Sequence, residues 1–495
     1  MNTFREAFEV DMNIKYTENG AKAHKSTTSK VYDLFAFGGA YRTRTDADKI
    51  LLFKEALEEN ETLALKCLFY LRDVRGGQGE RKFFRIAYRW LCETNIDIAL
   101  RNIELIPEYG RWDDLIYICE GTAAETVAFG IIKKQLLLDI KCKTPSLLGK
   151  WMPSENTSSQ KTRAVANKLR TFIGLNHKDY RLLLSKLRER IKVVERLMSA
   201  NRWEEIEFDK IPSKAGLIYK NAFARRDLIK EKYRNFITNK DTTVNAQTLY
   251  PYEVVAQANN IMWRKYDPTD VDRIAINKYW ANLPNYFEDS DNSLLTVIDT
   301  SVSMTWGTTP RPIDVAIGLG MYAGAYNNGI FKNCYISFAS RPQLMHIEGL
   351  DFVDKVRRIY ETSLCDNTNL QAVFDLLFSY IKSGKAKASD LPETIVIISD
   401  MEIDSAVTSR YDWGANGIST QMERLREEWA AAGIKLPHLV YWNVAARHNT
   451  ILDSGPDITF CSGASPVLFK QILTGKKGVD LMLETLYSDR YVPVQ

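Results

Sequence analysis

The chain has 495 residues, of which 45% are hydrophobic and 26% charged, and its formal net charge is +4. This length exceeds one typical core and predicts two or more domains, while the composition excludes a disordered chain. The seven cysteines are scattered without a C-x-x-C pair, which argues against a disulfide framework or a zinc site. No apolar run approaches the roughly 20 residues of a membrane helix, and the N-terminus lacks a signal-peptide core, so we expect a cytoplasmic protein with no membrane partner.

Residues 1–285 are predicted to form an α-helical domain. Apolar residues recur at helical spacing throughout this half. Successive short helices without intervening strands predict stacked helical hairpins, as in HEAT-like repeats. The predicted helices cover residues 46–57, 63–71, 81–91, 112–119, 124–138, 161–173, 177–199 and 213–225.

A glycine-rich segment, Arg75-Gly-Gly-Gln-Gly-Glu-Arg81, separates two of these helices. It lacks the G-K-[ST] ending of a phosphate-binding loop. We therefore expect a flexible turn that exposes its arginines and not a nucleotide site.

Charge is divided unevenly along the chain. Residues 1–285 contain 48 Lys and Arg against 37 Asp and Glu, whereas residues 286–495 contain 18 against 25. The window 151–240 alone contains 21 basic and 10 acidic residues. Such a basic region favours a polyanionic partner, and a nucleic acid is the one we predict.

The predicted nucleic-acid contacts, which become RNA contacts under the resemblance given below, lie on the basic helices of this window. The aromatic residues Tyr180, Trp203, Tyr219, Phe223 and Tyr233 are candidates for stacking on unpaired bases. The alternative is that the basic side chains solvate helix surfaces while the aromatic residues fill the core. The candidate cations are Lys161, Arg163, Lys168, Arg170, Lys178, Arg181, Arg188, Lys192, Arg225 and Arg226.

After a short acidic linker at residues 282–292, the pattern changes to strands alternating with helices. Continuous apolar strands predict a mostly parallel sheet covered on both faces, which is a doubly wound (Rossmann-like) α/β domain over residues 290–495. The predicted strands cover residues 294–298, 334–339, 343–347 (an edge strand), 393–400, 438–444 and 457–461. The predicted helices cover residues 312–326, 352–360, 370–382, 421–432, 467–473 and 480–487.

Oxygen-bearing side chains follow two of these strands and precede one helix. The first strand ends in Asp299-x-Ser301-x-Ser303, Thr368 precedes a helix, and Asp400 closes the most hydrophobic strand. Carboxylates and hydroxyls without nearby thiols or imidazoles suit Mg²⁺. The alternative for Asp-x-Ser-x-Ser alone is a helix cap.

These five residues match, one by one, the metal-ion-dependent adhesion site of the von Willebrand factor A domain, which residues 290–495 resemble. The resemblance implies a Mg²⁺ (or Mn²⁺) with an open position for a carboxylate from a protein partner. A helical half followed by this domain resembles the architecture of the Ro autoantigen, or TROVE, family. In Ro proteins the helical repeats close into a ring that binds small structured RNAs and the single-stranded ends of misfolded RNAs.

Three segments of the helical half resemble more closely an uncharacterised TROVE-like family. They are Leu34-Phe-Ala-Phe-Gly-Gly-Ala, Arg72-Asp-Val-Arg-Gly-Gly-Gln-Gly-Glu-Arg-Lys and Tyr109-Gly-Arg-Trp-Asp-Asp-Leu. The resemblance implies an RNA-binding component of a ribonucleoprotein.

Common catalytic motifs are missing from the sequence, and its five histidines are dispersed. His346 and His438 fall in strand-like runs and are expected to be edge or core residues. Glu402, two residues after Asp400, is expected to be an outward-facing carboxylate near the metal, and the alternative is that it supports the metal ligands or acts as a general base. We therefore expect a protein that is not an enzyme, with two alternatives: a scaffold that holds an acidic partner through the metal, and a Mg²⁺-dependent phosphodiesterase.

Overall fold

The computed structural model describes residues 14–16, 22–263, 270–288, 293–307, 309–362, 368–401, 421–446 and 457–495. The chain is divided into two compact units. Unit 1 comprises Met1–Cys67 and Ala246–Asp489, and unit 2 comprises Leu68–Asn245 and Arg490–Gln495. This division differs from the boundary drawn near residue 285, because helices from both ends of the helical half pack with the sheet. Among the described helices, none is long and apolar enough to cross a membrane.

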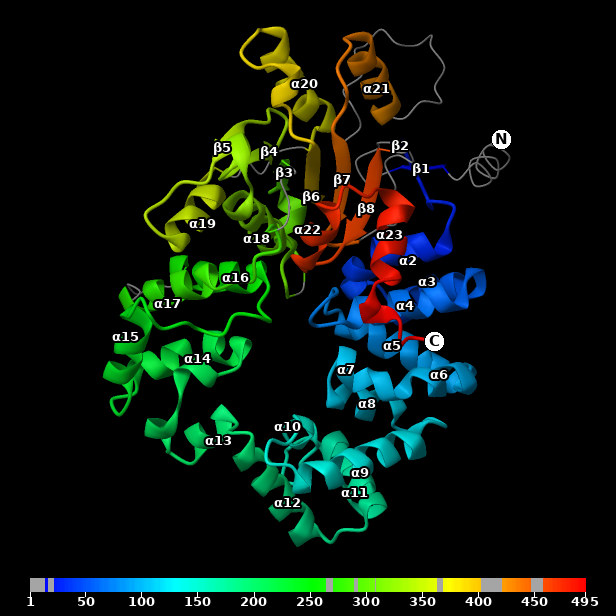
Figure 1. Cartoon of the computed structure of the whole chain (residues 1–495), viewed down its shortest axis with the longest axis vertical. Helices are drawn as coiled ribbons and strands as arrows, with labels where there is room; N and C mark the ends of the chain where they lie inside the picture. Colours follow the sequence, from blue (N-terminus) through cyan, green and yellow to red (C-terminus); the bar gives the residue numbers. More distant parts are fainter. Residues whose placement is uncertain are drawn as a thin grey trace. The chain divides into compact units, whose positions relative to one another are not determined.

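Unit 1 is built around a six-stranded sheet (Figure 1). Its strands are β3 (Leu294–Asp299), β4 (Cys334–Phe338), β5 (Leu344–His346), β6 (Thr394–Ser399), β7 (His438–Asn443) and β8 (Ile458–Ser462). The order is β5-β4-β3-β6-β7-β8, and all neighbours are parallel except β5, the antiparallel edge strand. Every residue of β3, β6 and β7 is buried, as expected for a parallel sheet covered on both faces. The predicted doubly wound α/β class is confirmed.

The helices of unit 1 come from both halves of the sequence. They are α2 (Lys30–Phe37), α3 (Asp46–Glu59), α16 (Pro251–Met262), α17 (Asp270–Ala281), α18 (Pro312–Tyr326), α19 (Phe352–Glu361), α20 (Leu370–Lys382), α21 (Gln421–Ala431), α22 (Val467–Ile472) and α23 (Gly478–Leu486). The predicted bounds of α18 and α20 are confirmed. A two-stranded antiparallel pair, β1 (Ile14–Tyr16) and β2 (Lys22–His24), precedes them.

Close backbone contacts explain why α2 and α16 belong with the sheet. The residue after α2, Gly38, is followed by Gly39, whose N–H donates to Ser462 Oγ at 3.0 Å. A Cβ on Gly39 would lie 2.6 Å from the Ser462 carbonyl oxygen, so only glycine fits against β8 there. Gly318 of α18 similarly meets the backbone of Tyr252 in α16. The Leu34-Phe-Ala-Phe-Gly-Gly-Ala segment therefore has a packing role.

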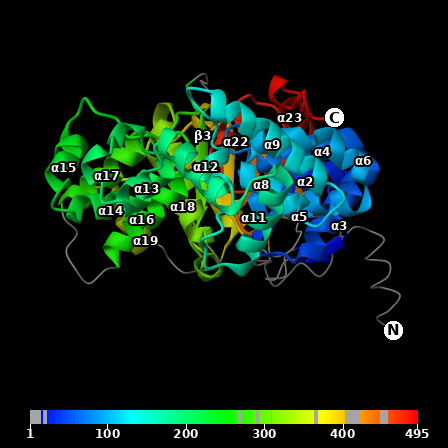
Figure 2. The same ribbon diagram turned by 90° about the horizontal axis from the view of Figure 1, so that it is seen from below.

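Among its described residues unit 2 contains helices and connecting segments but no strand, and the predicted helical class is confirmed (Figure 2 shows it with unit 1, from below). The division between the units falls within α4 (Glu61–Arg72). The remaining helices are α5 (Arg81–Thr94), α6 (Ile96–Asn102), α7 (Ile106–Tyr109), α8 (Trp112–Cys119), α9 (Glu125–Lys141), α10 (Leu148–Trp151), α11 (Gln160–Ile173), α12 (His177–Arg190), α13 (Val194–Ser199), α14 (Ser213–Arg225) and α15 (Lys230–Thr238).

The helix predicted over residues 177–199 is two helices, so that prediction is wrong in its length. The chain leaves helical geometry at Lys192, whose φ is +48°, and resumes it at Val194. A residue in the left-handed region ends a helix, and polar side chains gave no sign of this break.

The glycine-rich segment after α4 is a packed turn, in contrast to the flexible loop predicted from its composition. Gln78 N–H donates to the Tyr70 carbonyl at 3.1 Å, and Gln78 itself is buried. A Cβ on Gly77 would lie 2.0 Å from the same carbonyl, so glycine is required by close approach. Arg75 and Arg81 are exposed as predicted, with 62% and 49% of their side chains accessible.

Candidate functional site

The first candidate site lies at the carboxyl ends of β3 and β6. These strands are parallel neighbours, and Ile298 pairs with Ile398. Asp299 therefore ends β3 at nearly the level at which Asp400 follows β6. The chain continues from β3 to β4 on one side and adds β6 on the other, so the strand order reverses here. Open α/β sheets bind ligands at such reversal points.

Hydrogen bonds fix the Asp299 carboxylate at this position. Its Oδ1 accepts from the Ser301 backbone N–H at 2.9 Å, and its Oδ2 accepts from Ser399 Oγ at 2.6 Å. The hydroxyl oxygens of Ser301 and Ser303 are 3.0 Å apart. The structure therefore brings three of the predicted metal ligands together. Ser399, which the motif does not include, is a fourth oxygen at the site.

The environment of Asp299 is unfavourable for an isolated negative charge. Burial first, and then the charge of Asp400, raise the pKa of Asp299 to about 7. Both side chains are almost fully buried, with 0% and 1% of their surface accessible. A divalent cation would neutralise the negative charges of these two buried, neighbouring carboxylates.

The other two predicted ligands, Asp400 and Thr368, come from other elements. Asp400 is followed by Met401 in the left-handed region, with φ at +66°, which is a strained conformation for a non-glycine residue. Thr368 is buried just before Asn369, the N-cap of α20. A helix that leads into a parallel strand runs back along the sheet, which places its first turn toward the carboxyl edge. Glu402 lies outside the described residues.

The donor atoms at this site have the chemistry that Mg²⁺ or Mn²⁺ requires. No group of three or more His, Cys, Asp or Glu side chains suited to a metal occurs in the described part of the chain. The Ser301 and Ser303 hydroxyl oxygens are further oxygen donors beside the Asp299 carboxylate. Hard oxygen donors with room for water are typical of Mg²⁺ sites. The residues that could hold such an ion are Asp299, Ser301, Ser303, Thr368 and Asp400.

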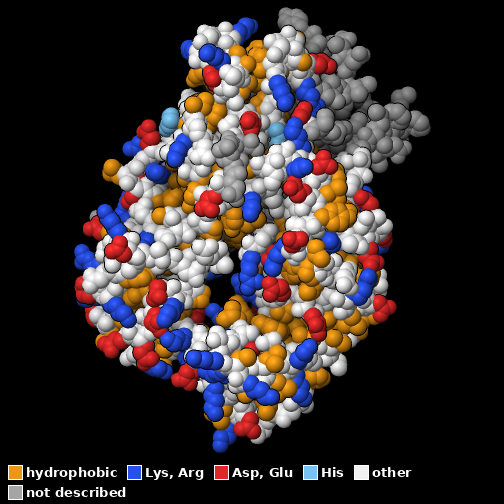
Figure 3. Space-filling view, in the orientation of Figure 1, with side chains coloured by type: hydrophobic (Ala, Val, Ile, Leu, Met, Phe, Trp, Pro, Cys, Tyr) orange, Lys and Arg blue, Asp and Glu red, His pale blue; other side chains and the backbone are white. Residues whose placement is uncertain are grey.

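The second candidate site consists of exposed cations on unit 2. Figure 3 shows Lys and Arg side chains interspersed with acidic ones over its helices. Lys161 and Arg163 of α11 and Lys178 of α12 are exposed, and none forms an ion pair with a described residue. Arg181 is also exposed, and its Nε donates to the His177 carbonyl. These side chains remain available to a polyanion.

Other predicted RNA contacts are engaged within unit 2. Lys168 pairs with Glu125 at 3.1 Å, Arg170 with Glu155 at 2.9 Å, and Lys192 with Glu207. Arg226 lies 5.2 Å from the Trp203 ring centre and donates to Asn201. Arg225 is exposed at the end of α14.

Arg188 has the clearest structural role of the ten. Its guanidinium donates to the Gly149 carbonyl at 2.9 Å, to Ser154 Oγ at 2.9 Å and to the Met152 carbonyl at 2.8 Å. Three such bonds hold the chain on either side of Trp151. This contact spans almost 40 residues in sequence and has no local signal.

The stacking prediction is wrong for three of its five aromatic residues. Tyr180, Phe223 and Tyr233 are buried, with at most 2% of their surface accessible, because they fill the core between helices. The other two, Trp203 and Tyr219, are half-buried. Two further accessible rings of unit 2 were not among the predicted residues. Phe172 is 38% exposed and Trp151 is half-buried. Helical spacing could have placed Phe172 on the outer face of α11, beside Lys168.

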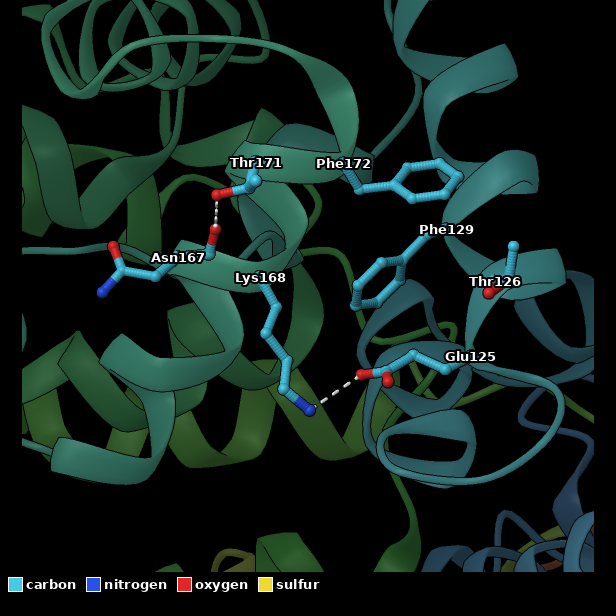
Figure 4. Close-up of a pocket in the computed structure, with 7 residues that line it drawn as sticks. All are labelled: Glu125, Thr126, Phe129, Asn167, Lys168, Thr171 and Phe172. Atoms are coloured by element: carbon cyan, nitrogen blue, oxygen red, sulfur yellow. Dashed lines mark hydrogen bonds and ion pairs between the residues drawn. The ribbon is translucent and has the colours of Figure 1, made fainter.

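A groove between α9 and α11 contains Phe172 and has a volume of about 610 Å³. Phe172 meets Phe129 edge-on, with ring centres 5.6 Å apart (Figure 4). Lys133 lies 5.9 Å from the Phe172 ring centre. The groove thus combines an accessible ring with cations and amide groups. Its lining residues are Glu125, Thr126, Phe129, Asn167, Lys168, Thr171 and Phe172.

Comparison with known protein families assigns both parts of the chain to described families. Residues 17–144 and 131–291 match the family described as "Domain of unknown function (DUF2828)", which together is more than half of the chain. The chain belongs to the DUF2828 family. Residues 293–489 match a second family, "Domain of unknown function (DUF7788)". The two matches meet at residues 291–293, in the predicted linker.

Two individual proteins are similar to this DUF2828 member. "Uncharacterized protein L728" of Acanthamoeba polyphaga mimivirus is 26% identical over 510 residues, covering 94% of this chain and 85% of that protein. The solved structure titled "Crystal structure of Deinococcus radiodurans RO (RSR) protein" is 12% identical, with a TM-score of 0.48. That match covers 91% of this chain and 100% of the other. At this level of similarity it assigns no ligand.

Proposed function

We propose that this protein binds RNA through the basic helices of unit 2, as a component of a ribonucleoprotein. The observation that carries the proposal is the separation of charge between the compact units. Unit 2 contains 35 Lys and Arg against 22 Asp and Glu, a net charge of +13, whereas unit 1 contains 31 against 40, a net charge of −9. Exposed, unpaired cations on one unit favour a polyanion by counterion release.

Single-stranded or loop RNA is the substrate that the side chains of unit 2 suit best. Lys161, Arg163 and Lys178 offer contacts to phosphates. The exposed ring of Phe172 offers a face on which an unpaired base can stack, and the nearby Asn167 amide can both donate and accept a hydrogen bond. Double-stranded RNA offers no unstacked base for such a ring.

The test is binding at two salt concentrations. A fluorescein-labelled 12-nucleotide oligouridine and a labelled hairpin of similar length are titrated with the protein at 50 and 200 mM KCl. We expect micromolar or tighter binding at low salt, weakening about tenfold or more at the higher concentration, because several phosphates are neutralised. Absence of binding to both RNAs at 50 mM KCl would refute the proposal.

We further propose that the strand-end site of unit 1 holds one Mg²⁺ or Mn²⁺, and that the ion receives a carboxylate from a protein partner. The buried pair of Asp299 and Asp400 supports this second function, because a cation relieves their mutual repulsion. Asp299, Ser301, Ser303, Thr368 and Asp400 would hold the ion, whose chemistry is to attract a hard oxygen ligand. Ser399 keeps the Asp299 carboxylate oriented through its 2.6 Å hydrogen bond.

Calorimetry with MnCl₂ tests the metal site directly. We expect one Mn²⁺ per chain, with binding lost in Asp299→Asn and Asp400→Asn. Asp390→Asn, which alters an exposed carboxylate of the same unit, is the control. Equal binding by all four proteins would contradict the assignment.

We propose that RNA binding is not followed by cleavage. The basic side chains assigned to RNA lie in unit 2, and the carboxylates lie in unit 1. Incubation of labelled RNA with protein and 5 mM MgCl₂ should leave the RNA intact. Cleavage that disappears in Asp400→Ala would instead establish a Mg²⁺-dependent phosphodiesterase.

A further inference from the structure

Two cations converge on one indole ring in unit 2, at a place that the predicted RNA contacts do not include. The guanidinium carbon of Arg111 lies 4.7 Å from the Trp151 ring centre, and Lys150 Nζ lies 5.6 Å from it. Arg111 precedes α8 in the Tyr109-Gly-Arg-Trp-Asp-Asp-Leu segment, and Trp151 ends α10. We call these three side chains the Trp151 cluster.

The chain that carries Lys150 and Trp151 is held in place by α12. Arg188 donates to the Gly149 carbonyl before this pair and to the Met152 carbonyl after it. Tyr180 Oη donates to the Pro153 carbonyl at 2.8 Å. A Cβ on Gly149 would lie 2.7 Å from Leu187 Cβ, so α10 packs tightly on α12. A site built on these residues is preorganised, which lowers the entropic cost of binding.

Nearby carboxylates are already engaged by other arginines. Asp114 accepts from Arg72 Nη2 at 2.6 Å and from Arg85 Nε at 2.6 Å. Asp113 accepts from Arg85 Nη2 at 2.7 Å and lies 3.8 Å from Arg81. These two acids therefore already interact with three arginines other than Arg111.

Arg111 is left with no anionic partner among the described residues. Its backbone N–H donates to Asp114, but its guanidinium forms no hydrogen bond or ion pair with a described side chain. Burial, and then the charge of Arg72, lower the pKa of Arg111 below its usual range. The charges of Asp113 and Asp114 act in the opposite direction but do not offset these effects.

The Trp151 indole adds a third unused donor. The ring is half-buried, and its N–H makes no hydrogen bond with any described residue. Cation–π contact explains one cation on the ring and is worth about 0.5–2 kcal/mol. Lys150 is a second cation near the same ring, and a bound anion would reduce the repulsion between the two positive charges.

We propose that Arg111, Lys150 and the Trp151 N–H form a binding site for a phosphate group. Arg111 presents a planar fork that matches two phosphate oxygens, Lys150 supplies a point charge, and the indole N–H donates a further hydrogen bond. The phosphate can belong to a polynucleotide or to a small phosphorylated compound. The site is separate from Lys161, Arg163 and Lys178 and does not depend on the RNA-binding proposal.

Trp151 fluorescence in the full chain tests the site. The protein and its Trp151→Phe variant are titrated with oligouridine 12-mer and, separately, with sodium pyrophosphate at 50 mM KCl, and the difference between them gives the Trp151 signal. We expect a saturable change in that signal, with the apparent Kd raised at least tenfold in Lys150→Gln and in Arg111→Gln. Arg75→Gln, an exposed arginine of the same unit, is the matched control and should bind like the parent.

The outcomes separate the two phosphate sources and the two proposals. A response to pyrophosphate alone assigns a small phosphorylated ligand, whereas a response to the 12-mer assigns a polynucleotide. The triple variant Lys161→Gln, Arg163→Gln and Lys178→Gln should keep the pyrophosphate response even where RNA affinity falls. No Trp151 response to either ligand, or an unchanged Kd in a folded Lys150→Gln protein, would overturn the site.

Discussion

The two compact units arrange their candidate residues in different ways. In unit 1 the candidates follow from strand register: Asp299 and Asp400 meet because β3 and β6 pair in parallel and end together. In unit 2 the candidates lie on helix surfaces, where Arg188 is engaged in holding α10 while Lys161 remains exposed. A motif at strand ends is thus fixed by the sheet, whereas the role of a surface cation depends on which helix packs beside it.

The largest expected effect on stability comes from breaking the buried ion pair of unit 2. Asp114 and Arg72 are both almost inaccessible and are joined by a 2.6 Å contact. Asp114→Asn leaves two arginines without their carboxylate, and we expect the free energy of unfolding of unit 2 to fall by about 3–5 kcal/mol. The loss is measured by urea denaturation monitored by hydrogen exchange, because exchange at individual backbone amides reports the stability of unit 2 separately from that of unit 1.

Glu108→Gln is the control for this change, because Glu108 forms exposed ion pairs with Arg75 and Arg490. Its expected loss is below about 1 kcal/mol. Similar losses in both variants would mean that burial does not distinguish these pairs.

A pH-dependent effect is expected in unit 1. Burial lowers the pKa of His438 to about 4, and its Nε2 lies 2.9 Å from Thr459 Oγ1. The unfolded chain binds the proton first as pH falls, so stability is present above about pH 6.5 and is lost as pH falls toward 4. Between pH 7.5 and 5 the loss from this group is about 2 kcal/mol.

The comparison is made against His438→Gln in urea at both pH values. Because the pKa of Asp299 is raised, its contribution to stability increases as the pH falls from 7.5 to 5. This contribution is the same in the parent and in the variant, so it cancels when their losses are compared. The parent should lose about 2 kcal/mol more than the variant on acidification. Equal pH dependence would show that His438 is not held neutral.

A smaller effect distinguishes the two kinds of cation in unit 2. Arg188→Gln removes hydrogen bonds to two carbonyls and a hydroxyl and should destabilise unit 2 by about 2 kcal/mol. Lys161→Gln changes an exposed side chain and should cost less than about 0.5 kcal/mol. Thermal melts of the two variants measure the difference. A Lys161→Gln loss as large as that of Arg188→Gln would contradict the assignment of roles.

Much of unit 1 could be predicted from the sequence, because strands and their terminal residues carry local signals. The bounds of α18 and α20, the edge position of β5 and the cluster around Asp299 all follow from hydrophobic runs and short motifs. The packing of α2 and α16 with the sheet could not be predicted, since it depends on close contacts at Gly39 and Gly318 with distant backbone.

Unit 2 was predictable in class but not in the use of its side chains. Helical spacing identifies the helices, yet the burial of Tyr180 and the capture of Gly149 and Met152 by Arg188 depend on tertiary contacts. The same holds for the Trp151 cluster, in which Lys150 and Trp151 come from α10 and Arg111 precedes α8. Charge density predicts that a surface is basic, and only packing shows which cations remain available.

RNA affinity of matched charge variants measures most directly whether unit 2 provides the RNA-binding surface. Lys161→Gln, Arg163→Gln and Lys178→Gln are combined in one protein, and three exposed lysines of unit 1, Lys332, Lys382 and Lys476, are changed to Gln in the other. Both lose three positive charges. We expect the unit 2 variant to bind the oligouridine 12-mer about tenfold or more weakly at 50 mM KCl, with a shallower salt dependence, and the unit 1 variant to bind nearly as the parent does. Equal loss in both variants, or no loss in either, would contradict the assignment of RNA binding to unit 2.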